Sequence, residues 1–151
     1  MSCVIADFEQ TGLLPCGVHW AAWAELEARY GLNTHRKKLL SGLRRGILSL
    51  RSARCRALYL DGSFVTAKAL PTDYDACWEM AGVDIRLVDP VLLDFSNRRA
   101  AQKLKYLGEY FPASARAESK HPFRVYLDFF QVDKELGVSK GIVGLKVQEC
   151  L

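Results

Sequence analysis

The sequence lacks three features that would assign it to a specialised class of protein. Its five cysteines are scattered and form no C-x-x-C pair, which argues against a disulfide framework and against a zinc knuckle. No window approaches the roughly 18 continuous apolar residues that a membrane span needs. The first residues, MSCVIADFEQ, have neither the basic nor the apolar region of a signal peptide. We therefore expect a cytoplasmic protein with reduced cysteines and no membrane segment.

Acidic residues are missing from the segment 34–56, which carries eight of the 21 lysines and arginines. The other 13 basic residues are outnumbered by 17 acidic ones. A basic segment on a mildly acidic remainder favours an anionic partner, such as tRNA or another nucleic acid bound through residues 36–45. A solvated helix face is the alternative. The basic residues of that stretch are Arg36, Lys37, Lys38, Arg44 and Arg45.

The length and the apolar patterns predict a single domain over residues 1–151, with helices before and within a small sheet. Helices are expected at 19–31, 34–50 and 97–111. Strands are expected at 56–61, 73–78, 82–88, 123–131 and 141–147. The apolar face of the second helix would be Leu39, Leu43, Ile47 and Leu50, and that of the third Ala100, Leu104, Leu107 and Phe111. The predicted fold class is α/β or α+β, a mixed sheet of about five strands flanked by helices.

Residues 58–79, LYLDGSFVTAKALPTDYDACWE, carry the candidate chemistry. Because side chains alternate along a strand, Asp73 and Asp75 should project to one side, with Cα atoms about 6.5–7 Å apart. Two carboxylates there are costly unless a cation lies between them, and Mg²⁺ or Mn²⁺ prefers such ligands together with phosphate oxygens. Gly62 permits a tight turn, and its N–H groups with the Ser63 hydroxyl suit a phosphate. The pattern favours a nucleoside triphosphate bound through a metal ion, and a solvated structural pair is the alternative.

Gly62, Ser63, Asp73 and Asp75 resemble the signature of the polymerase-β-like nucleotidyltransferase superfamily. That signature is an apolar residue, Gly, Gly or Ser, and then acid, apolar, acid, apolar. The segments GLLPCGVHW, FFQVD and KGIV look like those of small bacterial nucleotidyltransferase-like proteins. The resemblance implies transfer of a nucleotidyl group from ATP or another NTP to a hydroxyl of a protein, a tRNA or a small molecule. Phe64 stands where such proteins often carry a basic residue, so the charge would come from Lys68 or the basic helix.

The resemblance also implies a third carboxylate on a later strand, which completes the metal shell and activates the nucleophile. Asp128, in the strand expected at 123–131, matches that position. Asp133 and Asp84 are the alternatives.

Two rival functions follow from the same features. Minimal nucleotidyltransferases often pair with a toxin, so a non-catalytic or weakly catalytic antitoxin-type partner is one rival. A nucleic-acid-binding module that uses the helix 34–50 is the other. Since no second domain is evident, selectivity would come from a homodimer, a partner or the loop 113–122.

Overall fold

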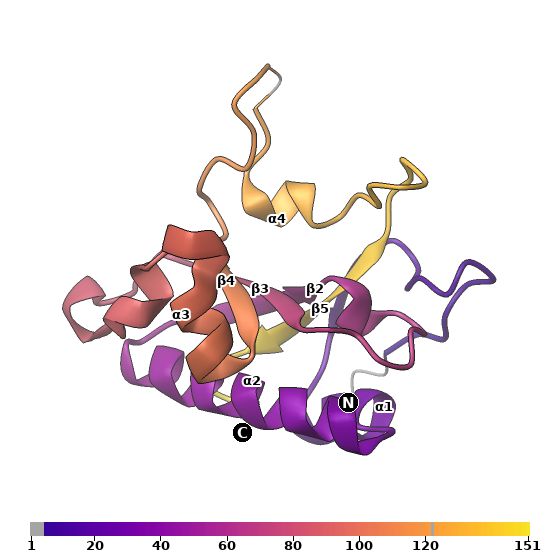
Figure 1. Cartoon of the computed structure of the whole chain (residues 1–151), viewed down its shortest axis with the longest axis horizontal. Helices are drawn as coiled ribbons and strands as arrows, with labels where there is room; N and C mark the ends of the chain where they lie inside the picture. Colours follow the sequence, from indigo (N-terminus) through magenta and orange to yellow (C-terminus); the bar gives the residue numbers. More distant parts are fainter. Residues whose placement is uncertain (1–4, 122) are drawn as a thin grey trace.

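A five-stranded mixed sheet forms the centre of the protein (Figure 1). The computed structural model describes residues 5–121 and 123–151. The strands are β1 (Gly17–Trp20), β2 (Ala57–Asp61), β3 (Tyr74–Trp78), β4 (Gly108–Pro112) and β5 (Gly141–Lys146), in the spatial order β1-β5-β2-β3-β4. β2 pairs antiparallel with β3 and with β5, whereas the pairs β1–β5 and β3–β4 are parallel. This arrangement confirms the predicted fold class.

The helices α1 (Trp23–Tyr30) and α2 (Thr34–Ser52) lie against one face of the sheet, as Figure 1 shows below it. The predicted apolar stripe of α2 is buried, and Asn33 caps the helix, since its side chain accepts a hydrogen bond from the Arg36 N–H at 2.8 Å. Gly46 lets α2 approach β4 closely, since a Cβ there would lie 1.9 Å from the Tyr110 hydroxyl oxygen. Within the described residues, no helix is long and apolar enough to cross a membrane.

The remaining helices lie between β3 and β5 along the chain. α3 (Ser96–Tyr106) precedes β4 and packs beside it, and the short α4 (Tyr126–Phe129) lies on the other side of the sheet (Figure 1). Short 3₁₀ turns occur at Ser63–Val65, Ile85–Leu87 and Pro90–Leu93.

Two of the predicted strands are wrong. The segment 82–88 contains the 3₁₀ turn Ile85–Leu87, in which Ile85 and Leu87 are both about half exposed. The segment 123–131 contains α4. Its aromatic residues follow helical spacing: the rings of Tyr126 and Phe130, four residues apart, both pack on Phe111. The β-prone composition of 123–131 is therefore overridden by tertiary packing.

The predicted helix 97–111 is too long, and its apolar face is wrong. The helix ends at Tyr106, because Leu107 adopts a left-handed conformation with φ 64° and Gly108 begins β4. Leu104 is 85% exposed, whereas Gln102 and Tyr106 are the buried residues of α3. The helix 19–31 likewise begins only at Trp23, after β1.

The two faces of the sheet bury different residues. Tyr74, Ala76 and Trp78 of β3 belong to the main hydrophobic core with α1 and α2. Cys77 and Phe111 belong to a smaller cluster with Phe130, the residue after α4. Since side chains alternate along β3, Asp75 shares the face of Cys77, and this less covered face carries the polar site.

Candidate functional site

Three carboxylates lie in one row across three neighbouring strands. Asp61 of β2 pairs with Asp75 of β3, and Asp75 pairs with Glu109 of β4. Directly paired residues project to the same face of a sheet. All three line a cavity of about 630 Å³ between the sheet and residues 126–140, a segment that begins with α4. The register of the sheet therefore gathers negative charge at one place.

Asp75 lies in the middle of the row, and its pKa is strongly raised. Burial and, after it, the nearby carboxylates of Asp73, Asp61 and Glu109 together raise its pKa from 3.8 to about 7, against a smaller effect of Lys134. A carboxylate surrounded by like charges is stabilised by a proton or by a cation. This residue is thus a candidate cation ligand or proton-transfer group.

Asp73 lies immediately before β3 and lines a second cavity of about 220 Å³. Burial and the Glu109 carboxylate raise its pKa, and Lys103 opposes them. Lys103 lines the small cavity, Glu109 lines the large one, and their ion pair of 3.2 Å stands between the two. Asp73 and Asp75 therefore interact electrostatically, but they line different cavities, whereas the strand pattern predicted that both would project to one side.

Gly62 allows the turn after β2 to pass directly beside Asp75. Its φ is 81°, and a Cβ there would lie 2.7 Å from Asp75 Oδ2. Only glycine suits both the left-handed backbone and this close approach. Ser63 begins the 3₁₀ turn that follows, and Ser63 and Lys68 line the large cavity together with Gly62. The structure thus brings the predicted glycine, serine and lysine together with Asp75.

A buried ion pair, Asp61–Lys140, lies beside this turn, and the sequence patterns did not reveal it. Lys140 Nζ is 2.7 Å from Asp61 Oδ1, and both side chains are largely buried. Burial raises the pKa of Asp61, and the Lys140 ammonium counteracts it. The pair leaves Asp75 as the carboxylate of the row without a close cationic partner of its own.

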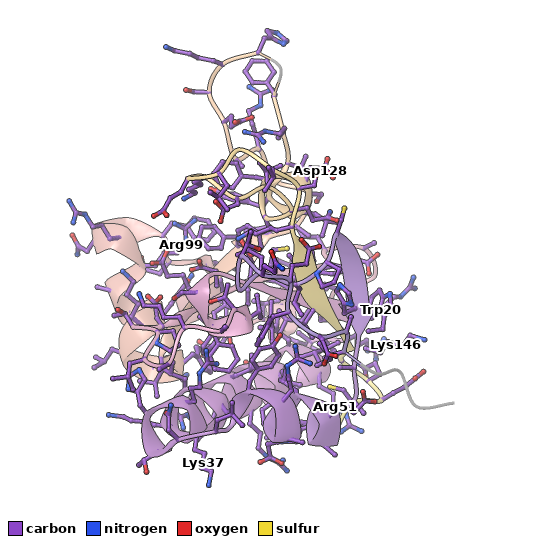
Figure 2. The ribbon with its side chains drawn as sticks, turned by 90° about the vertical axis from the view of Figure 1, so that its right-hand side faces the viewer. Trp20, Lys37, Arg51, Arg99, Asp128 and Lys146 are labelled. Carbon is purple, nitrogen blue, oxygen red and sulfur yellow. The ribbon has the colours of Figure 1, made fainter. Side chains whose placement is uncertain are left out.

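The predicted third carboxylate is not part of the row. Asp128 is exposed on α4 and lines neither of these two cavities (Figure 2). Asp133 does line the large cavity, but its carboxylate accepts hydrogen bonds from the N–H groups of Glu135 and Leu136 and so holds a local turn. Asp84 pairs with the exposed Arg86 instead.

Glu109, and not Asp128, is the carboxylate that lies beside Asp75 on the next strand. It was hidden inside the predicted helix 97–111. The signal that could have found it is the run Gly108 to Pro112, in which glycine ends the helix and two aromatic residues, favoured in strands, follow the acid.

Lysine and aromatic side chains complete the large cavity. Positive charge comes from Lys68, Lys134 and Lys140. The aromatic wall consists of Phe111, Tyr126, Phe129 and Phe130.

The available donors for a metal ion are the carboxylates of Asp73, Asp75 and Glu109. Within residues 5–121 and 123–151, no three His, Cys, Asp or Glu side chains are already grouped at metal-binding spacing. Mg²⁺, however, is commonly held by one or two carboxylates, with waters and substrate phosphates completing its shell. The oxygen chemistry of these residues fits such an ion, and so does the crowding of Asp75 by like charges.

The basic residues of α2 do not form one uniform surface, and Arg36 is not part of an exposed basic stretch. Arg36 is buried and donates hydrogen bonds to the carbonyl oxygens of Phe64 at 2.7 Å, Thr66 at 3.1 Å, and Lys68. Its role is to hold the loop that follows Gly62–Ser63, so it is not free to contact a polyanion.

The fold and the site together define a small α+β protein with an acid-lined cavity on the more open face of its sheet. The chain belongs to the family DUF6932, a family of unknown function, whose model matches residues 6–146. No curated protein and no solved structure matches the chain.

Proposed function

We propose that the protein is a metal-dependent nucleotidyltransferase, which moves a nucleotidyl group from a nucleoside triphosphate to an acceptor hydroxyl. The observation that carries the proposal is the position of Asp75 beside the glycine turn at Gly62, where burial and three nearby carboxylates together raise its pKa to about 7. Crowded carboxylates next to a potential phosphate cradle are what a metal-bound triphosphate needs. A protein that only neutralises a toxin would gain nothing from this repulsion.

The chain's own residues would divide the work between holding and positioning. Asp73 and Asp75 are the metal-holding carboxylates, and Glu109 takes the role that the resemblance implied for Asp128. Bound Mg²⁺ would supply neutralisation of the charge that develops on the transferring phosphate. Gly62 and Ser63 hold the phosphate tail close to Asp75, and this positioning supplies much of the catalytic effect.

The covalent step follows from this arrangement. The acceptor oxygen forms a bond to the α-phosphorus, and pyrophosphate leaves with the electrons of the broken bond. The hydroxyl proton passes to the Glu109 carboxylate. Lys68 and Lys134, which line the cavity, offset the charge of the departing pyrophosphate.

The test is labelling of a cell lysate with each α-³²P nucleoside triphosphate and Mg²⁺, together with calorimetric binding of Mg²⁺ and a non-hydrolysable triphosphate. We expect the wild type to label one acceptor. It should also bind the triphosphate more tightly with Mg²⁺ than without it. Asp75→Asn and Glu109→Gln should each lower labelling by at least about a hundredfold, as losses of charge stabilisation at reacting phosphates do.

The matched control is Asp128→Asn, which removes a carboxylate outside both cavities and should label as well as the wild type. If Asp128→Asn abolishes labelling while Glu109→Gln does not, the assignment of Glu109 is wrong. If the wild type neither binds the triphosphate nor labels any acceptor, the nucleotidyltransferase proposal is wrong.

A further inference from the structure

The small cavity beside Asp73 has two lysines in its wall, besides the apolar side chains of Leu39 and Leu107. Lys38 of α2, Lys103 of α3 and Thr72 contribute to its wall, with His35 and Asp73. The His35 ring is held there by a hydrogen bond between Nε2 and the Pro71 carbonyl oxygen. Two helices that are distant in sequence thus direct lysines toward a carboxylate of the candidate site.

The basic residues of α2 point in different directions, and only some of them lie toward this cavity. Lys38 and Arg45 are seven residues apart, two helical turns, and therefore lie on one side of α2, about 10 Å apart along its axis. That side faces α3, because Arg45 donates a hydrogen bond to the Lys105 carbonyl oxygen at 3.0 Å. Gly42, between them, would bring a Cβ to 2.1 Å from the Tyr106 carbonyl oxygen. We call the surface formed by Lys38, Arg45 and Lys103 the α2–α3 seam.

Other cations of α2 lie away from the seam. Arg44 lies over the Trp23 ring of α1, 6.0 Å from its centre. Lys37 points away from the sheet at the lower edge of the molecule in Figure 2. These two residues provide an internal comparison, since they carry the same charge on the same helix.

We propose that the α2–α3 seam binds a single-stranded nucleic acid whose end enters the small cavity and supplies the acceptor hydroxyl. This inference rests on the proposed nucleotidyltransferase function. Lys38, Lys103 and Thr72 would contact the terminal phosphate, and Arg45 a phosphate further along the strand. The Lys103–Glu109 ion pair separates the two cavities, so the strand end and the triphosphate meet at the carboxylates from opposite sides.

The chemistry of the cavity favours a nucleic-acid end over an acidic peptide. A strand end carries a hydroxyl within a few bonds of a phosphate, which matches a cavity that holds both lysines and a carboxylate. The acidic side chains of a peptide would offer the lysines a carboxylate but no hydroxyl within a few bonds of it.

The test measures binding of a fluorescein-labelled short single-stranded RNA in EDTA, without triphosphate, so that binding is separated from catalysis. The seam variant Lys38→Gln/Arg45→Gln is compared with the matched control Lys37→Gln/Arg44→Gln, which removes the same charge. The seam variant should bind at least about tenfold more weakly. The slope of log affinity against log salt should become shallower by about 1.4, since each lost phosphate contact on a single strand contributes about 0.7.

Asp73→Asn should change affinity in the opposite direction, because it removes a negative charge from the cavity. We expect RNA to bind this variant a few times more tightly than the wild type. If both double variants lose affinity and salt dependence equally, the proposal that the α2–α3 seam binds RNA is wrong.

The seam and the proposed function fail in distinguishable ways. If labelling occurs on a protein or a small molecule and the RNA does not bind, the seam is wrong and the transferase stands. If the RNA binds the seam as described but no triphosphate is bound or transferred, the binding surface stands and the transferase proposal is wrong.

Discussion

Replacing Asp75 by asparagine should stabilise the metal-free protein, by an amount that grows with pH. Burial and three neighbouring carboxylates raise the pKa of Asp75 from 3.8 to about 7. Between these two pH values, the folded chain binds more protons at this site than the unfolded chain does. The stability of the wild type therefore falls as the pH rises through this window and levels off above it.

The size of the effect follows from the pKa difference. Three pKa units correspond to about 4 kcal/mol at 1.36 kcal/mol each. Asp75 is not completely buried, and solvent screening reduces such an interaction, so we expect about half, ~2 kcal/mol. Asparagine cannot ionise and avoids this cost. For a chain of this length, ~2 kcal/mol corresponds to a melting temperature about 4–8 °C higher.

The assay is thermal unfolding followed by circular dichroism in EDTA at pH 4 and at pH 8. Wild type and Asp75→Asn should melt at similar temperatures at pH 4, and the variant should melt higher at pH 8. Mg²⁺ should then stabilise the wild type and not the variant, because a ligand that binds only the folded state raises its stability. Asp128→Asn, at an exposed position, is the control, and its melting temperature should match that of the wild type at both pH values. A variant that melts below the wild type at both pH values would refute the electrostatic reasoning.

Three further substitutions test the surroundings of the site. Gly62→Ala should lower the free energy of unfolding by at least about 1 kcal/mol in chemical denaturation, since it strains a left-handed residue and contacts Asp75. Arg36→Lys should cost about 3 kcal/mol in the same measurement, because it leaves loop carbonyls without their forked donor. Asp61→Asn should destabilise by about 3 kcal/mol or more by leaving Lys140 buried and unpaired, whereas the apolar double variant Asp61→Leu/Lys140→Met should recover most of that loss in thermal melts.

The parts of the fold that could be predicted are those in which local pattern and tertiary packing agree. The stripe of α2, from Leu39 to Leu50, has helical spacing in sequence and is buried in the structure. β2, β3 and β5 are short apolar runs bounded by turn residues, and they form the centre of the sheet. Local propensity and burial favour the same state in each of these segments.

The failures occurred where a second partner decides the conformation. The aromatic residues around Asp128 are β-prone, but Phe111 of β4 offers them a surface that suits helical spacing. α3 ends where Leu107 adopts a left-handed conformation. Leucine has no preference for that conformation, so the sequence does not indicate this end. Glu109 was missed for this reason, since its strand was assigned to the preceding helix.

The ion pair Asp61–Lys140 shows a second limit of sequence patterns. The two residues are 79 positions apart and meet only because β2 and β5 are neighbours in the sheet. In contrast, Gly62, Ser63 and Asp75 were predicted correctly as neighbours, because a single strand–turn–strand unit connects them.

The contrast between the two faces of the sheet has a consequence for how related chains could diverge. The main hydrophobic core lies between the sheet and α1, α2 and α3, whereas the large cavity lies on the opposite face, where the excursion between β4 and β5 supplies the part of its wall that faces the sheet. Exposed positions of that excursion, such as Lys134 and Glu135, can change without opening the main core. The exposed part of the cavity wall and the main core thus lie on opposite faces, so substitutions at these exposed positions should reshape the cavity with little loss of stability.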